Sequence, residues 1–142
     1  MTNDIHALVE HRLAQAAETL QAAVELLDAD HYRDAVNRGY YAMFYAGLAL
    51  LATRALGTSK HSGLLSLFGR HFVKTGMFSA QAGRYLRQAF ELRQECDYQD
   101  FVEPTREQAD EIVAHAKEFL VEADRVWAVI KENGIGDEEP SE

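Results

Sequence analysis

The residues best suited to chemistry lie in the stretch FELRQECDYQDF, residues 90–101. Arg93 precedes Asp97 by four positions and Tyr98 by five. A guanidinium binds phosphate or carboxylate through several N–H groups, a carboxylate can accept a proton, and a phenol can donate one. These three residues are therefore the candidate catalytic residues. The alternative is that Arg93 and Asp97 form an ion pair that satisfies itself at the edge of the core.

The helical period places Arg93 and Asp97 on an apolar face. With Leu86 at zero and 100° per residue, Arg93 falls at about 340° and Asp97 at about 20°, in the same sector as Ala89 and Phe90. An ion pair in this order contributes only a few tenths of a kcal/mol, whereas taking an ion out of water costs several. The pattern favours a charged pair that lines a cleft.

Lys60 and His61 are candidate ligand-binding residues at the expected start of a helix. Unpaired N–H groups at a helix N-terminus favour anions, and the Lys60 ammonium could reach a phosphate there. We interpret His61 as a helix-start residue rather than a catalyst, because it lies in a turn between helices. His61 follows Arg54 with six residues between them, a spacing that about one pair in a chain of this composition reaches by chance.

Other kinds of site have weaker support in the sequence. A bundle enzyme with two bridged metals needs Glu-x-x-His on two helices, and the chain offers only DADH at residues 28–31. It has no phosphate loop and no glycine-rich dinucleotide turn. Cys96 lies on the apolar stripe and is interpreted as a small core residue rather than a nucleophile. The sequence therefore predicts neither a metal site nor a cofactor.

The composition indicates one all-α domain in a reducing compartment. The chain has 142 residues, 47% of them hydrophobic, with two prolines and one cysteine. Such a chain can bury a core, favours helices, and has no internal disulfide. The longest apolar run, YYAMFYAGLALLA, is shorter than the roughly 20 residues that cross a bilayer. We expect a cytoplasmic protein without a membrane segment.

The charge is unevenly distributed. A net charge of −9 argues against a nonspecific nucleic-acid binder, because phosphate neutralisation supplies most of that affinity. From Lys60 to Arg93, however, six basic residues and one acidic residue give +5, which leaves −14 for the rest. This segment indicates either a basic binding face or a helix pair whose surface happens to be basic.

Five helices are expected to form an up-and-down bundle over residues 1–134, followed by a disordered acidic tail, DEEPSE, within residues 135–142. The first helix is capped by Asn3 or Asp4 and ends near Leu27. The acidic DAD at residues 28–30 then caps a second helix over 31–55. The third helix is predicted to be capped by Ser59 or Ser62 and to end at KTG. The fourth is predicted to run from its cap Ser79 to about Tyr98. The fifth is predicted to begin with a capping box of Thr105 and Gln108 and to end at Asn133 and Gly134.

The middle of the second helix, residues 40–52, contains no charged residue. A helix that is apolar all round is buried on every side. In so small a protein it must be central or also form a subunit interface, so we predict a homodimer. Its aromatic residues, including Tyr41, could stack bases, but their helical spacing is more typical of core or dimer contacts.

Three separated segments, NRGYYAMFYAGLALL, SKHSGLLSLF and ELRQECDY, together resemble the HEPN domain family. The chain is most similar to small stand-alone prokaryotic members that are often encoded beside a minimal nucleotidyltransferase. The resemblance covers residues 7–127 and implies an all-α bundle, a homodimer, and a role in toxin-antitoxin or other RNA-associated systems. It also implies that Arg38 is the family's charged residue in the second helix; the alternative is that Asp34 simply pairs with Arg38.

Active members of that family carry an arginine and, after four to six residues, a histidine. Arg93 matches the arginine, but Tyr98, Gln99 and Asp100 occupy the positions where the histidine would stand. The resemblance therefore implies a dimeric module that binds a nucleotide, an RNA end or a nucleotidyltransferase partner, and Tyr98 is where that partner would attach a nucleotide. The alternatives are a metal-independent endoribonuclease toxin with a degenerate site, and a helical scaffold without a ligand.

Overall fold

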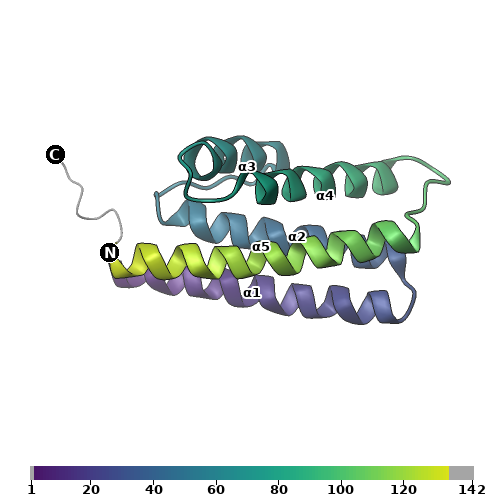
Figure 1. Ribbon diagram of the computed structural model, residues 1–142, viewed down its shortest axis with the longest axis horizontal. Helices are drawn as coiled ribbons and strands as arrows, with labels where there is room; N and C mark the ends of the chain where they lie inside the picture. Colours follow the sequence, from purple (N-terminus) through teal and green to yellow (C-terminus); the bar gives the residue numbers. More distant parts are fainter. Residues whose placement is uncertain (1, 135–142) are drawn as a thin grey trace.

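The computed structural model describes residues 2–134, and the tail predicted over residues 135–142 lies outside this range. Five α-helices and one π-helical turn make up the described chain, which contains no strand. In order they are α1 (Thr2–Asp28), α2 (Tyr32–Ala52), α3 (His61–Phe68), η1 (Gly69–Val73), α4 (Ala80–Tyr98) and α5 (Arg106–Glu132). The predicted all-α bundle of five helices is confirmed, with α1, α2, α4 and α5 lying lengthwise and α3 packed across one end (Figure 1).

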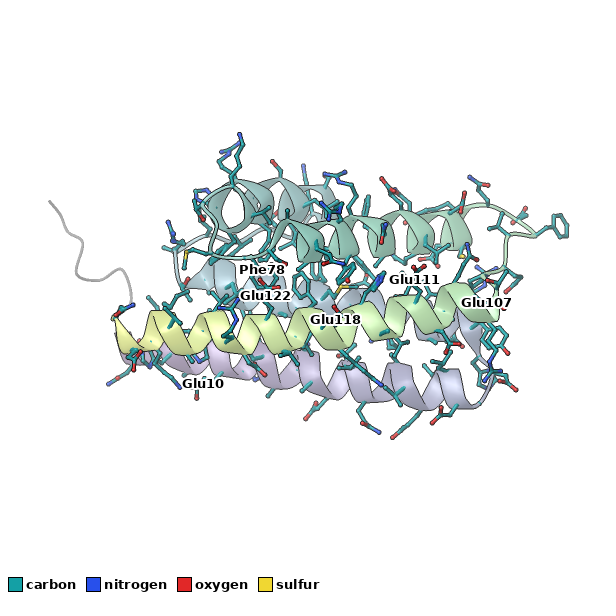
Figure 2. All side chains as sticks on the ribbon, viewed as in Figure 1. Glu10, Phe78, Glu107, Glu111, Glu118 and Glu122 are labelled. Atoms are coloured by element: carbon teal, nitrogen blue, oxygen red, sulfur yellow. The ribbon has the colours of Figure 1, made fainter. Side chains whose placement is uncertain are left out.

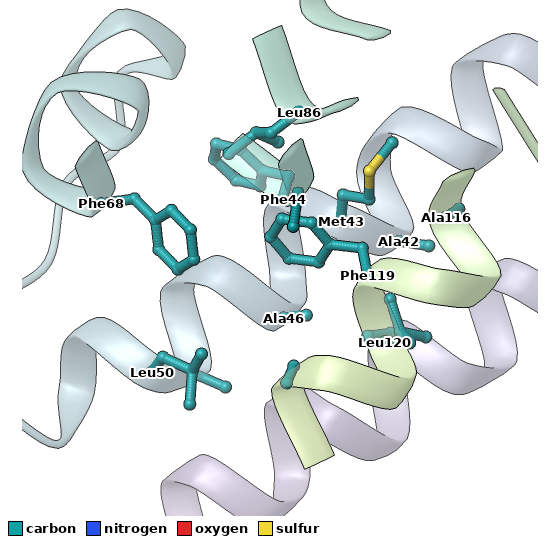
Figure 3. Close-up of a cluster of buried hydrophobic side chains, with 14 of the residues drawn as sticks. Ala42, Met43, Phe44, Ala46, Leu50, Phe68, Leu86, Ala116, Phe119 and Leu120 are labelled. Carbon is teal, nitrogen blue, oxygen red and sulfur yellow. The ribbon is translucent and has the colours of Figure 1, made fainter. Parts of the chain in front are cut away.

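Helix α2 is the central element, as its uncharged middle predicts. It packs against α1, α3, α4 and α5. Large apolar side chains from four helices meet around it in one core (Figure 3). Fully or almost fully buried members of this core are Met43, Leu50, Phe68, Leu86 and Phe119. The central position of α2 means that any polar residue on it is held by packing from several sides.

Two predicted helix starts are confirmed in detail. The hydroxyl of Ser79 accepts a hydrogen bond from the backbone N–H of Ala82 and caps α4. Thr105 and Gln108 form a complete capping box at the start of α5. Both caps satisfy N–H groups that a helix leaves unpaired, and the sequence shows them because the capping residues are neighbours in the chain.

Three other predicted starts are wrong. Helix α1 already includes Thr2, ahead of the expected caps Asn3 and Asp4. Helix α2 begins after His31 without a side-chain cap, because Asp30 instead accepts a 2.7 Å hydrogen bond from Arg106 in an ion pair. The local sequence pattern assigned the Asp30 carboxylate to capping α2, but in the fold this carboxylate binds Arg106 of α5.

Helix α3 also begins and ends differently from its prediction. Its N-cap is Lys60, not Ser59 or Ser62. The hydroxyl of Thr58 accepts the Lys60 N–H at 3.1 Å, so a residue ahead of the helix orders the turn. At its other end the predicted α-helix widens into the π-helical turn η1, and such turns are frequent at functional sites.

Gly39 lets α2 approach α5 closely. A Cβ atom at this position would lie 2.9 Å from Cγ2 of the buried Ile112. We expect Gly39→Val to lower the free energy of unfolding by about 1–3 kcal/mol, because the packed core cannot move aside. Urea unfolding measures this loss. Gly69→Ala, whose Cβ would meet nothing within 4 Å, is the matched control, and an equal loss there would refute the packing explanation.

Within residues 2–134, every helix is too short or too polar to cross a bilayer.

Candidate functional site

Arg93 and Asp97 lie where the helical period places them. Arg93 Nε is 2.9 Å from Asp97 Oδ2, and the two side chains are 12% and 28% exposed. The Nε–H does not point at the oxygen, so the contact is an ion pair without a well-aligned hydrogen bond. The guanidinium is therefore sheltered, paired with one carboxylate, and not saturated by it.

The Arg93 guanidinium lies over two aromatic rings of α2. Its Cζ is 5.5 Å from the ring centroid of Tyr40 and 5.4 Å from that of Tyr41. A cation over the face of an aromatic ring is attracted by its quadrupole. These contacts fix the guanidinium against α2 and explain how an arginine can sit on the inner side of α4.

His61, the first residue of α3, lies against the same two tyrosines. Its Nδ1 is 2.6 Å from the Tyr40 hydroxyl, and its Nε2 is 3.4 Å from the Tyr41 hydroxyl. The ring also lies near Phe44 and stacks on Phe90 of α4, with centroids 4.9 and 6.3 Å away. The fold thus brings a histidine from another helix beside Arg93. We call Arg93, Asp97, His61, Tyr40 and Tyr41 the Arg93–His61 site.

Burial controls the protonation of this site. Burial lowers the pKa of His61, and the positive charge of Arg93 lowers it further. Burial also raises the pKa of Tyr40, so its phenol stays protonated. One of the two neutral tautomers of the imidazole donates its Nδ1–H to the Tyr40 oxygen and leaves an electron pair on Nε2, which faces the Tyr41 hydroxyl at 3.4 Å. In that tautomer His61 can accept a proton from a ligand.

Arg38 adds a second cation on the outer side of Tyr41. Its Nε and Nη2 donate to Asn37 Oδ1 at 3.0 and 2.8 Å, and its Cζ is 5.1 Å from the Tyr41 ring centroid. Within the described chain, Asp34 makes no ion pair with it. Tyr41 is therefore in contact with two guanidinium groups, and a half-buried tyrosine of this kind can also face a ligand.

Tyr98 and Lys60 do not join the cluster. The Tyr98 side chain is 72% exposed and lines a shallow hollow with Glu91, Gln94 and Gln99 on the outer side of α4. Lys60 is exposed beside His61 at the start of α3. The structure therefore brings together Arg93, Asp97, His61, Tyr41 and Arg38 from the predicted residues, with Lys60 at the edge and Tyr98 elsewhere.

Arg33 anchors the end of α4 that carries Asp97. Its Nη1 donates to the carbonyl of Cys96, and its Nη2 donates to the carbonyl of Val102 and to a carboxylate oxygen of Glu103, both at 2.8 Å. These bonds tie the α4–α5 connection to α2. Arg33 thus holds the backbone immediately before Asp97.

Cysteine and metal chemistry find little support in the described residues. Cys96 is 2% exposed, and burial raises the pKa of its thiol, so the thiolate needed for nucleophilic attack is disfavoured. Across residues 2–134, no three His, Cys, Asp or Glu side chains gather closely enough to hold a metal ion.

Sequence reasoning assigned Tyr40 mainly to core or dimer contacts, and it missed Asn37 and Phe90 as supports of the site. Tyr40 is fully buried and reads as core, yet its hydroxyl holds His61. The two residues are 21 positions apart, so no local spacing could have linked them. The one signal in the sequence is the pair of adjacent tyrosines, with their two hydroxyl groups, in the uncharged middle of α2.

Comparison with known proteins matches this chain to a family. The HEPN domain model matches residues 9–126. A Methanocaldococcus jannaschii protein named “Putative toxin” is 36% identical over 132 residues, which cover 93% of this chain and 96% of that protein. A Thermotoga maritima “UPF0332 protein” is 39% identical over 118 residues, which cover 83% of this chain and 89% of that protein. A second “Putative toxin” of M. jannaschii is 34% identical over 112 residues, which cover 79% of this chain and 76% of that protein.

The family match spans most of the described helices, from α1 to the last turns of α5, and includes the whole Arg93–His61 site. The expected resemblance is thereby confirmed: the chain belongs to the HEPN domain family.

Proposed function

We propose that this chain is the toxin-like HEPN component of a cytoplasmic two-protein system, and that its Arg93–His61 site binds the phosphate of a nucleotide or of an RNA end. The names of the M. jannaschii relatives support the toxin-like role. The partner would be an antitoxin or a nucleotidyltransferase. The single observation that carries the binding proposal is the sheltered Arg93 guanidinium, held over Tyr40 and Tyr41 beside a neutral histidine.

The chemistry of the site suits a phosphate attached to a base. A guanidinium has five N–H donors, and within residues 2–134 Asp97 is the only carboxylate paired with Arg93. Donors therefore remain for a phosphate. Tyr41 and Phe90 are half-buried rather than fully buried, and base stacking on an aromatic ring is worth about 1–3 kcal/mol. A nucleotide can use both features at once.

Substitution of Arg93 tests this proposal. We expect Arg93→Ala to raise the dissociation constant of adenosine monophosphate by about 10- to 150-fold, because a hydrogen bond to a charged group contributes about 1.5–3 kcal/mol. Adenosine, which lacks the phosphate, should bind weakly to both proteins. Isothermal titration calorimetry in EDTA measures each affinity.

The matched control is Arg87→Ala, which removes an exposed arginine from the same helix. Its affinity for adenosine monophosphate should stay within about twofold of the parent protein. Equal affinity of Arg93→Ala and the parent would contradict the proposal, as would tight binding of adenosine itself. If the folded protein binds neither adenosine monophosphate nor adenosine, the result would support the interpretation of the chain as a helical scaffold without a ligand.

The position of His61 favours a second candidate function, metal-independent cleavage of RNA. The 2′-hydroxyl would attack the adjacent phosphorus and lose its proton to His61 Nε2, while the bond from phosphorus to the 5′ oxygen breaks and that oxygen takes a proton from water. Arg93 would stabilise the charge on the phosphate oxygens. The products would carry 2′,3′-cyclic phosphate and 5′-hydroxyl ends.

A homodimer is also part of the proposal. Tyr41, Tyr45 and Leu48 follow one another along one side of α2 and remain half-buried in the single chain. Such a stripe would be covered if a second copy packed against it, which would also place two Arg93–His61 sites near a common two-fold axis.

A further inference from the structure

A groove with an apolar lining lies between α3 with η1 and the first half of α4. Its volume is about 290 Å³, near the lower limit of the roughly 300–1,000 Å³ typical of pockets that enclose a small ligand. Phe68, the aromatic residue of this lining, is only 1% exposed. The groove therefore offers a ligand aliphatic surface and bare backbone rather than an open ring. These parts of its lining come from Leu65, Gly69, Val73, Ala80, Gly83 and Leu86.

Gly69 keeps one side of this groove open. A Cβ atom at Gly69 would meet nothing within 4 Å, and its φ of −59° lies in the ordinary right-handed helical region. By contrast, a Cβ atom at Gly39 or Gly83 would lie 2.9 or 3.0 Å from another side chain. Neither close packing nor an unusual backbone conformation therefore explains a glycine at position 69. Because glycine is a poor helix former, its place at the start of η1 favours a role in leaving room for a ligand.

Basic side chains border this groove on both sides. Arg84 and Arg87 line it from α4, while η1, on the other side, carries Arg70 and ends at Lys74. All four side chains belong to exposed residues, and within residues 2–134 no carboxylate lies within ion-pair distance of any of them. Carboxylates gather elsewhere, for example in the row of glutamates along α5 that Figure 2 labels. The rim of the groove is thus a positive surface.

We propose that this groove is a docking site for an acidic segment of a partner protein, in which large aliphatic side chains are flanked by aspartate or glutamate. The aliphatic side chains would enter the groove beside Gly69, and the carboxylates would pair with Arg84 and Arg87 on one side and with Arg70 and Lys74 on the other. Burial of apolar surface supplies the affinity of such a contact, and complementary charges fix its register. The groove shares no residue with the Arg93–His61 site, so this inference goes beyond the proposed function and does not depend on it.

The lining favours a protein segment over nucleic acid. Positive grooves that bind single-stranded nucleic acid also present aromatic rings on which the bases stack, whereas Phe68 of this groove is almost completely buried. A sugar-phosphate backbone would satisfy the basic rim but leave the aliphatic lining without a matching contact. An acidic segment with aliphatic side chains uses the lining and the rim together.

The first arm of the test blocks the groove. A phage-displayed library of random short peptides is selected on the parent protein, and synthetic copies of the enriched peptides are titrated by calorimetry. We expect them to carry aspartate or glutamate beside leucine, isoleucine or methionine. Gly69→Phe, which places a large side chain in the groove, should weaken their binding by about 10- to 100-fold, the contribution of one buried aliphatic side chain. The matched control is Gly57→Phe, at an exposed glycine whose Cβ would also meet nothing within 4 Å; its affinity should stay within about twofold of the parent's.

The second arm removes charge from the rim. Arg84→Gln with Arg87→Gln should weaken peptide binding by about 2- to 30-fold, and most at low salt, because each exposed ion pair contributes modestly and is screened by ions. A copy of the peptide with glutamine in place of glutamate and asparagine in place of aspartate should bind the parent and this double variant equally, which a structural effect of the substitutions would not produce. The control is Lys117→Gln with Arg125→Gln, which removes the same charge from a separate hollow on α5 and should match the parent. Urea unfolding shows that each variant is folded.

Three results would overturn the inference. In the first, no enriched peptide loses affinity in Gly69→Phe. In the second, the peptides that do lose affinity there carry no acidic residue. In the third, an oligoadenosine RNA binds the parent more tightly than the peptides and loses affinity in Gly69→Phe, which would make the groove a nucleic-acid surface. Because these variants leave the Arg93–His61 site intact, they should bind adenosine monophosphate as the parent does, and a failure of the parent to bind that nucleotide would refute only the proposed function.

Discussion

Under the second candidate function, replacing His61 with glutamine is expected to slow metal-independent RNA cleavage by about 100- to 10,000-fold, the usual contribution of a general base. Glutamine keeps a polar side chain near the Tyr40 hydroxyl but cannot accept the proton of a 2′-hydroxyl. The measurement is the rate of cleavage of a labelled RNA in EDTA, with the 2′,3′-cyclic ends of the products identified by mass spectrometry.

Two controls make this result specific. His11→Gln replaces an exposed histidine of α1 and should leave the rate unchanged. Arg93→Ala should also abolish cleavage, which excludes a contaminating nuclease. If His61→Gln is folded by circular dichroism and cleaves at the parent's rate, the histidine does not act as the base.

Under the same candidate function, the pH dependence of cleavage has a definite sign. Burial and the charge of Arg93 lower the pKa of His61, and the base must be neutral to act. The rate should therefore fall as the pH falls through the folded-state pKa, which lies below the ordinary value of about 6.5. Cleavage should persist at a pH where an unperturbed histidine would already be protonated. If lowering the pH already reduces the cleavage rate at pH values above about 6.5, the pKa of His61 is not lowered by its surroundings.

The sequence predicted those features that depend on neighbours in the chain. The helices, the caps of α4 and α5, and the inward position of Arg93 and Asp97 all follow from the helical period or from residues three or four apart. Such contacts are fixed once a helix forms. For the same reason the period placed the apolar stripes correctly around the core.

The composition of the site could not be predicted in the same way. His61 reaches Tyr40 only because α3 packs across α2 and α4, and Arg33 reaches Cys96 from 63 positions away. The local pattern treated His61 as part of a turn. Tertiary packing, which no spacing encodes, gave that histidine a position beside Arg93.

Tyr98 shows that two residues adjacent in the sequence need not belong to the same site. It follows Asp97 directly, but one residue of a helix turns by 100°. Asp97 therefore contacts Arg93 on the inner side, whereas Tyr98 is 72% exposed. A reaction that modifies Tyr98 would take place outside the Arg93–His61 site, at the open hollow on α4.

Replacing Phe119 with alanine is expected to lower the free energy of unfolding by about 3–5 kcal/mol. Phe119 is fully buried and lies beside Phe68 in the core (Figure 3). Its ring centroid is 5.6 Å from that of Phe68 and 4.9 Å from that of Phe78. Alanine would leave a cavity where α5, α3 and the segment before α4 meet. Because small domains are stable by only about 5–15 kcal/mol, the midpoint of urea unfolding should fall clearly.

Val121→Ala, a substitution on the exposed side of the same helix where the valine is 69% exposed, should change stability by about 0.5 kcal/mol or less. Equal losses for the two variants would contradict the core that is assigned to Phe119. Helix α5 contributes no residue to the Arg93–His61 site, so the folded fraction of Phe119→Ala should bind adenosine monophosphate with the parent's affinity. Phe119→Ala should thus lose stability but keep its affinity for adenosine monophosphate, whereas Arg93→Ala should lose that affinity. Together the two variants would separate the residues that stabilise the bundle from those that bind its ligand.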